Sequence, residues 1–172
     1  MLSSSAQVVV RKAGPADATA LAAVFGDSWR FAYRGIIPHL HLESMIRRRA
    51  ADWWVNAMRA GDGLLVLDVA NTVAGYATFG RSRERRTFPN VGGEIYEIYL
   101  APAYQGGGFG ERLFESCRYQ LDQRGLDGLL VWALADNAGA IEFYWRRGGR
   151  PAAKTFDRIG GARLAKIAFV WD

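Results

Sequence analysis

A glycine-rich turn between a strand-like segment and a helix-like segment constrains the fold of this chain more than any other feature. Residues 94–100 alternate in polarity and are rich in Ile and Tyr, which predicts a strand. Four of the six residues from Gln105 to Gly110 are glycine, and apolar residues at helical spacing follow them. Glycine lets the backbone approach a ligand closely, and the N-terminus of a helix attracts anions. The segment therefore predicts a strand–turn–helix unit suited to a pyrophosphate group.

The spacing of this turn argues against two common phosphate-binding motifs. A P-loop ends in Gly-Lys-Ser/Thr, and no lysine lies near the turn. A dinucleotide-binding turn reads G-x-G-x-x-G, whereas Gly106 and Gly108 are followed by Glu111 at the third position. The pattern that fits is Gln-x-x-Gly-x-Gly, at Gln105, Gly108 and Gly110. A tight turn without a ligand remains the alternative for a glycine cluster taken alone.

Hydrophobic periodicity in the rest of the chain predicts the element order β-α-α-β-β-β-α-β-α-β-β. The expected strands are 7–11, 64–70, 73–79, 94–100, 129–135, 150–158 and 163–171. Four helices are expected: one begins at Gly14-Pro15, one covers 41–58, one follows the glycines and one covers 138–147. This order predicts one mixed α/β domain spanning residues 1–172, with a central sheet and helices on both faces.

Composition narrows the partners and the compartment. The net charge of +5 suits an anionic partner, either a nucleic acid or a phosphorylated cofactor. We expect no nucleic acid, because the chain has no helix-turn-helix or RNA-binding signature. The single cysteine, Cys117, has no Cys/His cluster around it, so we expect no metal site and a reducing compartment. Polar Met1–Gln7 and the lack of a long apolar run predict a cytoplasmic protein without a signal peptide or membrane span.

A second segment strengthens the interpretation of the glycine turn. Residues 137–148 read Asn-x-x-Ala-x-x-Phe-Tyr-x-x-x-Gly, at Asn137, Ala140, Phe143, Tyr144 and Gly148. Together the two segments resemble the two signatures of the GNAT acetyltransferase superfamily, in the expected order. A weaker resemblance, from Ser28-Trp29-Arg30 to Pro38, is to the first-helix region of a GNAT subgroup that acts on small molecules.

Two positions depart from the family pattern. Gly149 stands where an aromatic residue is usual, and Gly106 and Gly107 stand where an arginine is frequent. Neither departure removes a backbone donor, so the phosphate-binding turn is retained. The missing basic contact to the phosphates could come from another residue, such as Arg112.

The resemblance implies a fold and a cofactor. The fold is a mixed, mostly antiparallel sheet of about seven strands flanked by about four helices, and the cofactor is acetyl-CoA. Strand backbone at Ile98 to Leu100 would pair with the pantetheine arm, and Asn137 would add a side-chain hydrogen bond. The implied cofactor-binding residues are Ile98, Tyr99, Leu100, Gln105, Gly106, Gly107, Gly108, Phe109, Gly110, Glu111, Arg112, Asn137, Ala140 and Phe143.

The resemblance also implies direct attack of an amine on the acetyl carbonyl in a ternary complex. Tyr144 would protonate the leaving thiolate, with a packed core tyrosine as the alternative. Glu94 and Glu97 are candidate bases, and Glu94 lies eleven residues before Gln105, as in several family members. Three residues apart, the two carboxylates would face opposite ways unless a β-bulge intervenes. A water chain without a dedicated base is the other alternative, and the oxyanion donor is expected at the backbone near Ile98.

The acceptor site is the least constrained part. Trp29, Tyr33 and Arg34 are expected to bind the acceptor, although the two aromatic residues could equally belong to the core. We expect a primary amine of a small molecule as acceptor. The alternatives are a protein N-terminus or lysine, and a non-catalytic acyl-CoA-binding sensor. A homodimer through the terminal strands is also expected from the resemblance.

Overall fold

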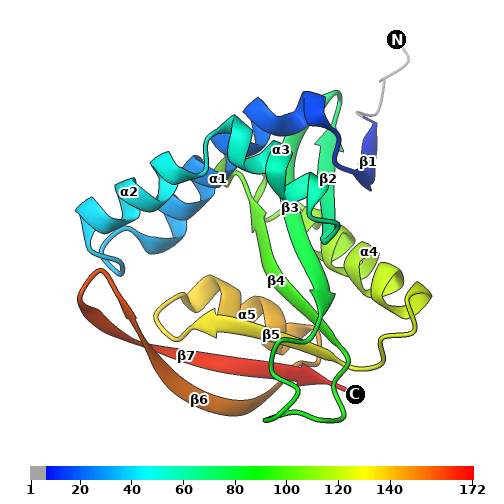
Figure 1. The fold of residues 1–172 in the computed structure, drawn as a ribbon, viewed down its shortest axis with the longest axis vertical. Helices are drawn as coiled ribbons and strands as arrows, with labels where there is room; N and C mark the ends of the chain where they lie inside the picture. The colour runs from blue at the N-terminus through cyan, green and yellow to red at the C-terminus, as the bar shows by residue number, and fades with distance from the viewer. Residues whose placement is uncertain (1–6) are drawn as a thin grey trace.

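The computed structural model describes residues 7–172, which form one seven-stranded sheet and five α-helices (Figure 1). The strands are β1 Val8–Lys12, β2 Gly63–Val69, β3 Thr72–Arg81, β4 Gly93–Leu100, β5 Leu129–Leu134, β6 Arg150–Ile159 and β7 Ala162–Trp171. The helices are α1 Ala18–Tyr33, α2 His39–Arg48, α3 Ala51–Arg59, α4 Phe109–Gln123 and α5 Ala138–Arg146. The strand order is β1-β2-β3-β4-β5-β7-β6, and only the β4–β5 pair within it is parallel. The mixed, mostly antiparallel sheet is confirmed.

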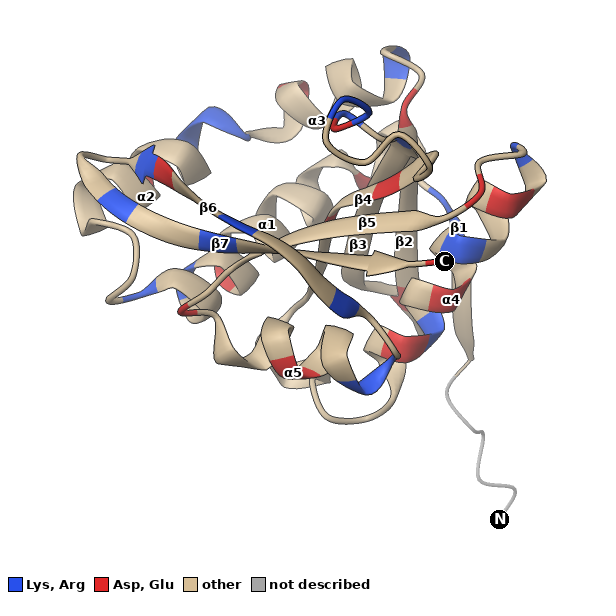
Figure 2. Cartoon of the chain, turned by 90° about the horizontal axis from the view of Figure 1, so that it is seen from below, with Lys and Arg blue, Asp and Glu red and all other residues tan. Residues whose placement is uncertain are grey.

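Helices cover both faces of the sheet because side chains alternate across each strand. On one face, Phe25 of α1 and Trp54 of α3 pack with Tyr76 of β3. On the other face, Phe114 of α4 and Tyr144 of α5 belong to the larger core, which also contains strand residues of β2, β3, β4, β5 and β7. Figure 2 shows α4 and α5 on the side of the sheet opposite to α3.

A β-bulge in β4 settles how the two candidate carboxylates are oriented. Thr78 pairs with Glu97 and the next residue, Phe79, pairs with Ile95, so one residue of β4 is skipped. Ile95 and Ile98 consequently both pack into the core beneath α4 and α5, although they are three residues apart. By the same count, Glu94 and Glu97 share the opposite face of β4.

The sheet opens between β4 and β5. Within the described chain these two strands pair at Gly93 with Leu129 and at Glu94 with Leu130, and beyond that point they diverge (Figure 1). The remaining length of β4, up to Leu100, keeps its partner β3 on one edge and has no strand on the other. Backbone groups on that free edge are available to a ligand.

The expected helix over 41–58 is wrong as a single element, because the structure divides it into α2 and α3. Arg49 leaves the helical conformation, with φ −100° and ψ 50°. Its guanidinium binds Glu97 of β4, and its carbonyl accepts a hydrogen bond from the Trp54 indole. Residues 7–172 therefore contain five α-helices, one more than the sequence predicts. The break depends on contacts with distant residues, so no local signal such as Gly or Pro marks it.

The tip of the β6–β7 hairpin reaches the first turn of α2 (Figure 1). Ile159 and Leu164 of the hairpin pack against the cluster formed by Ile37 and Leu42. Gly160 lies so close to His41 that an added Cβ would stand 2.6 Å from the His41 Cβ atom. The hairpin therefore closes over the end of the helical layer.

Charged residues of both signs alternate over the surface, with basic bands along β6 and β7 (Figure 2). The positive charge is thus distributed rather than gathered into one patch in this view. Along residues 7–172, no helix combines the length and apolar character needed to cross a membrane.

Candidate active site

A cleft of about 740 Å³ lies where β4 and β5 diverge. It is bounded by the end of α1, β4, the glycine turn, β5 and α5. The expected site residues that line it are Tyr33, Ile98, Tyr99, Leu100, Gln105, Gly106, Gly108, Gly110, Glu111, Asn137, Ala140, Phe143 and Tyr144. The structure therefore brings together most of the residues that the two signatures indicate.

The glycine turn presents a row of free backbone donors to this cleft. Gly106 and Gly108 have φ angles of 83° and 82°, which L-residues rarely adopt. Within residues 7–172, no oxygen atom accepts a hydrogen bond from the N–H groups of Gly106 through Glu111, and the first such bond of α4 joins the Arg112 nitrogen to the Gly108 carbonyl. Free N–H groups at a helix N-terminus, together with the helix dipole, suit an anion such as a diphosphate.

Close packing of α4 against α5 explains one further glycine of the turn. A Cβ atom on Gly110 would stand 2.9 Å from Cε2 of Phe143. Glycine at this position lets the N-terminus of α4 approach α5 directly. The glycine turn and the second signature therefore form one wall of the cleft.

The free edge of β4 supplies the second ligand-binding element. Tyr99 and Leu100 pair with Tyr76 and Gly75 on the β3 side, and the opposite edge faces the cleft. The Leu100 carbonyl is approached by Nε2 of Gln105 at 3.4 Å. Amide groups of an extended chain could pair with this edge as a further strand would.

Tyr144 points an unengaged hydroxyl toward the cleft. Its side chain is only 5% exposed, and its ring packs against Phe114, Phe169 and Trp171. Among the described residues, its hydroxyl has no hydrogen-bond partner, and Tyr144 lines the cleft. Burial raises the pKa of Tyr144 well above its ordinary value, so the phenol stays protonated at neutral pH.

The two candidate bases have different surroundings. Glu94 is 6% exposed and accepts a hydrogen bond of 2.8 Å from the Arg83 backbone. Burial raises the pKa of Glu94, and the hydrogen bond and charge of Arg83 oppose that effect. Glu97 is held by Arg49 at 2.7 and 3.0 Å and by the Tyr76 hydroxyl at 3.2 Å. Both carboxylates lie outside the lining of the cleft.

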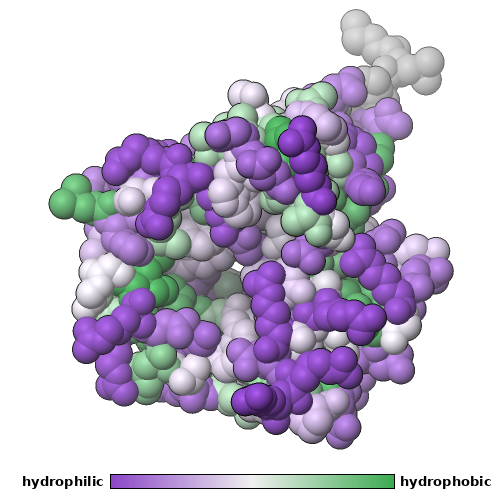
Figure 3. Space-filling model, in the orientation of Figure 1, coloured by the Kyte–Doolittle hydropathy of each residue, from purple (hydrophilic) through white to green (hydrophobic). Residues whose placement is uncertain are grey.

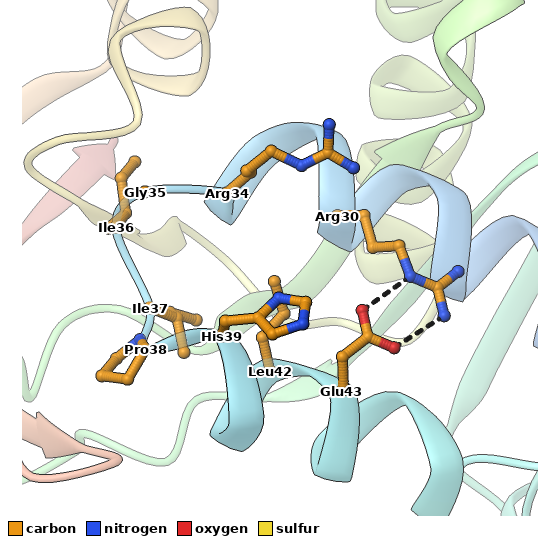
Figure 4. Close-up of a pocket in the computed structure, with 9 residues that line it drawn as sticks. All are labelled: Arg30, Arg34, Gly35, Ile36, Ile37, Pro38, His39, Leu42 and Glu43. Carbon is orange, nitrogen blue, oxygen red and sulfur yellow. Dashed lines mark hydrogen bonds and ion pairs between the residues drawn. The ribbon is translucent and has the colours of Figure 1, made fainter.

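The three expected acceptor residues have different surroundings, although the rings of Trp29 and Tyr33 are in contact. Trp29 donates to the Tyr76 hydroxyl at 3.3 Å and stacks on Phe25, which is the core alternative. Tyr33 lines the cleft and shares a hydrogen bond with the Tyr99 hydroxyl. Arg34 lines a different cavity, of about 370 Å³, between the end of α1 and the start of α2. Figure 4 shows Arg34 above that cavity.

Some expected cofactor residues have other partners. The Arg112 guanidinium donates to the Val8 carbonyl at 2.9 Å, and the Phe109 ring packs against Tyr104. These two residues and Gly107 lie outside the cleft lining. Asn137 accepts a hydrogen bond from the Ala140 backbone at 3.2 Å, so it caps α5, and its side chain also interacts with the Tyr33 hydroxyl.

The sequence reasoning missed two residues that line the cleft. The Trp132 indole nitrogen and the Arg147 Nε atom are buried, and neither has a hydrogen-bond partner among the described residues. Unpaired buried donors are costly, so their place at the cleft fits a ligand that offers acceptor oxygens. Arg147 could have been found from the sequence, because it directly precedes Gly148 of the second signature. No sequence signal marks Trp132 beyond its place on β5.

These features fit the cofactor that the resemblance implies. The free N–H row suits the diphosphate of acetyl-CoA, the open edge of β4 suits the amides of its pantetheine arm, and Tyr144 lines the same cleft.

Comparisons with known proteins agree with this geometry. Residues 24–148 match the family described as the acetyltransferase (GNAT) family. The N-acetyltransferase YuaI of Bacillus subtilis, which is uncharacterised, is 33% identical over 165 residues, covering 95% of this chain and 92% of the relative. A shorter match is to the mycothiol acetyltransferase of Nocardia farcinica, 40% identical over 60 residues, which are 35% of this chain and 20% of that protein.

Solved structures share the fold. The PaiA N-acetyltransferase of Thermoplasma acidophilum, in complex with coenzyme A, superposes with a TM-score of 0.75 at 20% identity, covering 94% of this chain and 98% of that one. The ribosomal-protein-alanine N-acetyltransferase of Brucella melitensis has a TM-score of 0.70 at 24% identity, covering 95% and 98%. From its sequence match, its fold and its cleft, this chain belongs to the GNAT acetyltransferase family and is an acetyl-CoA-dependent N-acetyltransferase.

Proposed function

We propose that this acetyltransferase modifies a primary amine of a small molecule. The observation that carries the proposal is the contact between the β6–β7 hairpin and α2. Ile159 and Leu164 pack on Ile37 and Leu42, and Gly160 lies against His41. Figure 3 shows a hollow on the face of the molecule seen in Figure 1. An extended polypeptide that crossed the site at this end would have to separate the hairpin from α2, whereas a small amine would not.

The acceptor would enter the part of the cleft formed by α1 and β4. Ser28, Ala32 and Tyr33 line it from α1, and Tyr99 lines it from β4. Burial raises the pKa of both tyrosines, so their linked hydroxyls stay neutral and can orient an amine by hydrogen bonding.

Bound acetyl-CoA supplies the activated acetyl group for direct attack by the amine. The free backbone edge of β4 near Ile98 supplies N–H groups to the oxygen that gains negative charge. Tyr144 holds a proton at its hydroxyl, and no protein group within the described chain competes for that proton. The proposed role of Tyr144 is to donate the proton to the departing sulfur.

Glu94 is the proposed base, acting through water. It shares the face of β4 with Glu97, but its carboxylate is not neutralised by an arginine side chain. Glu97, in contrast, has both oxygens bound by Arg49, so its proposed role is to anchor α2 and α3 to β4.

A protein N-terminus or lysine is the alternative acceptor, and a non-catalytic acyl-CoA-binding sensor is the alternative to an enzyme. The names of similar proteins do not choose between a small-molecule and a protein acceptor, because one refers to mycothiol and another to an alanine of ribosomal proteins. A non-catalytic acyl-CoA sensor would need no free phenol at the thioester position. The Tyr144 hydroxyl therefore favours an enzyme.

The test is release of free coenzyme A, followed with a thiol reagent across amino acids, polyamines, aminoglycosides and peptides. Burial of Cys117 raises its thiol pKa, so the enzyme itself adds little background. Turnover of one class of small amines, with peptides inactive, is the expected result. Faster turnover of a peptide would replace the small-molecule proposal, and cofactor binding without turnover on any acceptor would favour the sensor.

A homodimer is part of the same proposal. β6 is the edge strand of the sheet, it spans ten residues and most of its residues are exposed. An exposed strand edge can pair with another chain. Light scattering coupled to size exclusion would give twice the 19.0 kDa chain mass if the dimer forms.

A further inference from the structure

The diphosphate site of this chain has backbone donors but no cationic side chain on the glycine turn. Gly106 and Gly107 have no side chains, and the guanidinium of Arg112 is directed to the Val8 carbonyl. The first turn of α4 instead carries Glu111, whose side chain is 64% exposed and which lines the cleft. A carboxylate at this position repels phosphate oxygens, so a compensating cation is needed nearby.

Arg147, just after α5, lies opposite the first turn of α4, with its guanidinium beside the Glu111 carboxylate. Its guanidinium lies 3.7 Å from the centre of the Phe143 ring, and its side chain is 19% exposed. The Nη1 atom donates to the Phe143 carbonyl at 3.1 Å, and the Arg147 carbonyl accepts from the Trp171 indole at 2.9 Å. Stacking and these two hydrogen bonds fix both the backbone and the plane of the guanidinium.

The guanidinium has donors to spare. An arginine carries five N–H groups, and the Phe143 carbonyl takes one of them. The Nε atom is buried without a partner among the described residues, and the nearest Glu111 oxygen is 3.6 Å from Nη2. That distance is an ion pair and is too long for a hydrogen bond. Several donors of a fixed, planar cation are therefore free beside the row of backbone N–H groups.

We propose that Arg147 binds the diphosphate of the coenzyme and replaces the cation that the glycine turn lacks. This inference rests on the cofactor assignment and not on the identity of the acceptor. The position of Arg147 beside Glu111 and the N-terminus of α4 assigns it to the diphosphate. Phosphate oxygens displace Glu111 as the partner of Nη2.

The test is binding of ligands to the intact enzyme, measured by calorimetry without any acceptor. Arg147→Gln should weaken binding of coenzyme A by roughly 10-fold or more, because a charge-assisted phosphate contact is lost. Binding of dephospho-coenzyme A, which lacks the 3′-phosphate, should weaken by the same factor. Binding of pantetheine, which has no phosphate, should be the same in both proteins. Arg147→Lys should recover part of the affinity, because it keeps the charge but not the planar fork.

Controls separate this role from a loss of net charge or of fold. Arg150→Gln removes one positive charge from the edge strand β6, where Arg150 pairs with Asp172 away from the cleft, and should bind coenzyme A as the parent does. Glu111→Gln should bind coenzyme A several-fold more tightly, because it removes the repelling carboxylate. Melting temperatures of the free proteins report whether each variant is folded.

Four outcomes would overturn the proposal. The first is unchanged coenzyme A affinity in Arg147→Gln, and the second is an equal loss of pantetheine affinity in that variant. The third is a loss of coenzyme A affinity in Arg147→Gln without a loss of dephospho-coenzyme A affinity. The fourth is a loss of coenzyme A affinity in Arg112→Gln but not in Arg147→Gln. The third outcome would place Arg147 on the 3′-phosphate. A failed search for an acceptor would leave the inference standing, because no arm of the test uses turnover.

Discussion

Arg49 holds the carboxylate of Glu97 at 2.7 Å and joins the α2–α3 break to the middle of β4. Its guanidinium also lies 4.5 Å from the Phe25 ring centre and 4.2 Å from that of Trp53. The Arg49 side chain thus connects β4 with α1 and with the junction between α2 and α3.

Substitution of Arg49 is expected to destabilise the fold. Arg49→Ala leaves Glu97 partly buried without its partner and removes the aromatic stacking, which should cost about 2–4 kcal/mol of unfolding free energy. Arg49→Lys should lose less unfolding free energy than Arg49→Ala, because lysine keeps the charge without the planar fork. Urea unfolding measures both. Arg30→Ala is the matched control, since the Arg30–Glu43 pair is more exposed, and it should cost much less. Equal losses at the two positions would contradict the anchoring role.

Removal of the Tyr144 hydroxyl is expected to affect catalysis alone. Tyr144→Phe should lower kcat by roughly 100-fold or more, in line with a lost general acid. Coenzyme A affinity and melting temperature should hardly change, because the hydroxyl has no hydrogen-bond partner within the described chain. Steady-state kinetics and calorimetry separate these effects. Full activity in this variant would assign Tyr144 to packing.

The buried carboxylate of Glu94 predicts a pH-dependent activity. Burial raises the pKa of Glu94, so activity should rise with pH through a midpoint above the ordinary glutamate value of ~4.3. Glu94→Gln should lower kcat/KM and abolish that limb of the profile. A profile with the same limb in the variant would show that another group or a water chain is the base.

The same shift in pKa predicts the sign of a stability effect. A carboxyl group with a raised folded-state pKa favours the folded protein below its unfolded pKa, and that contribution is lost as pH rises through the folded pKa. The charged form of Glu94 is therefore less favourable in the native protein than in the unfolded chain. Glu94→Gln should melt higher than the parent at pH 7, and the difference should shrink at acidic pH. A lower melting temperature at pH 7 would show that the Arg83 contact outweighs burial.

A side chain at Gly108 is expected to abolish cofactor binding. An added Cβ meets no protein atom within 4 Å, so a valine there would occupy ligand space, besides a strain of about 1–2 kcal/mol from the positive φ. Gly125→Val is the matched control, since Gly125 also has a positive φ and open surroundings at the far end of α4. Calorimetry with coenzyme A should show a loss for Gly108→Val only. Unchanged binding would remove the glycine turn from the site.

The strands, most of the helices and the two signature segments were predictable from local sequence alone. Strands and helices were predictable because the period of apolar residues is local, and the positive φ of Gly106 and Gly108 needs glycine whatever surrounds it. The resemblance also named Tyr144 and most of the glycine turn as site residues; the structure brings them to one cleft, and their roles stay predictions.

The directions of individual polar side chains depend on tertiary contacts and were not predictable from local sequence. Arg112 is bound by Val8, 104 residues away, Arg49 by Glu97, 48 residues away, and Trp29 by Tyr76, 47 residues away. The cleft itself exists because β4 and β5 diverge after two pairs, and the bulge in β4 turns Glu94 and Glu97 to one face. These features depend on pairs of residues distant in the sequence, so they are fixed when the sheet assembles and leave no local pattern to read.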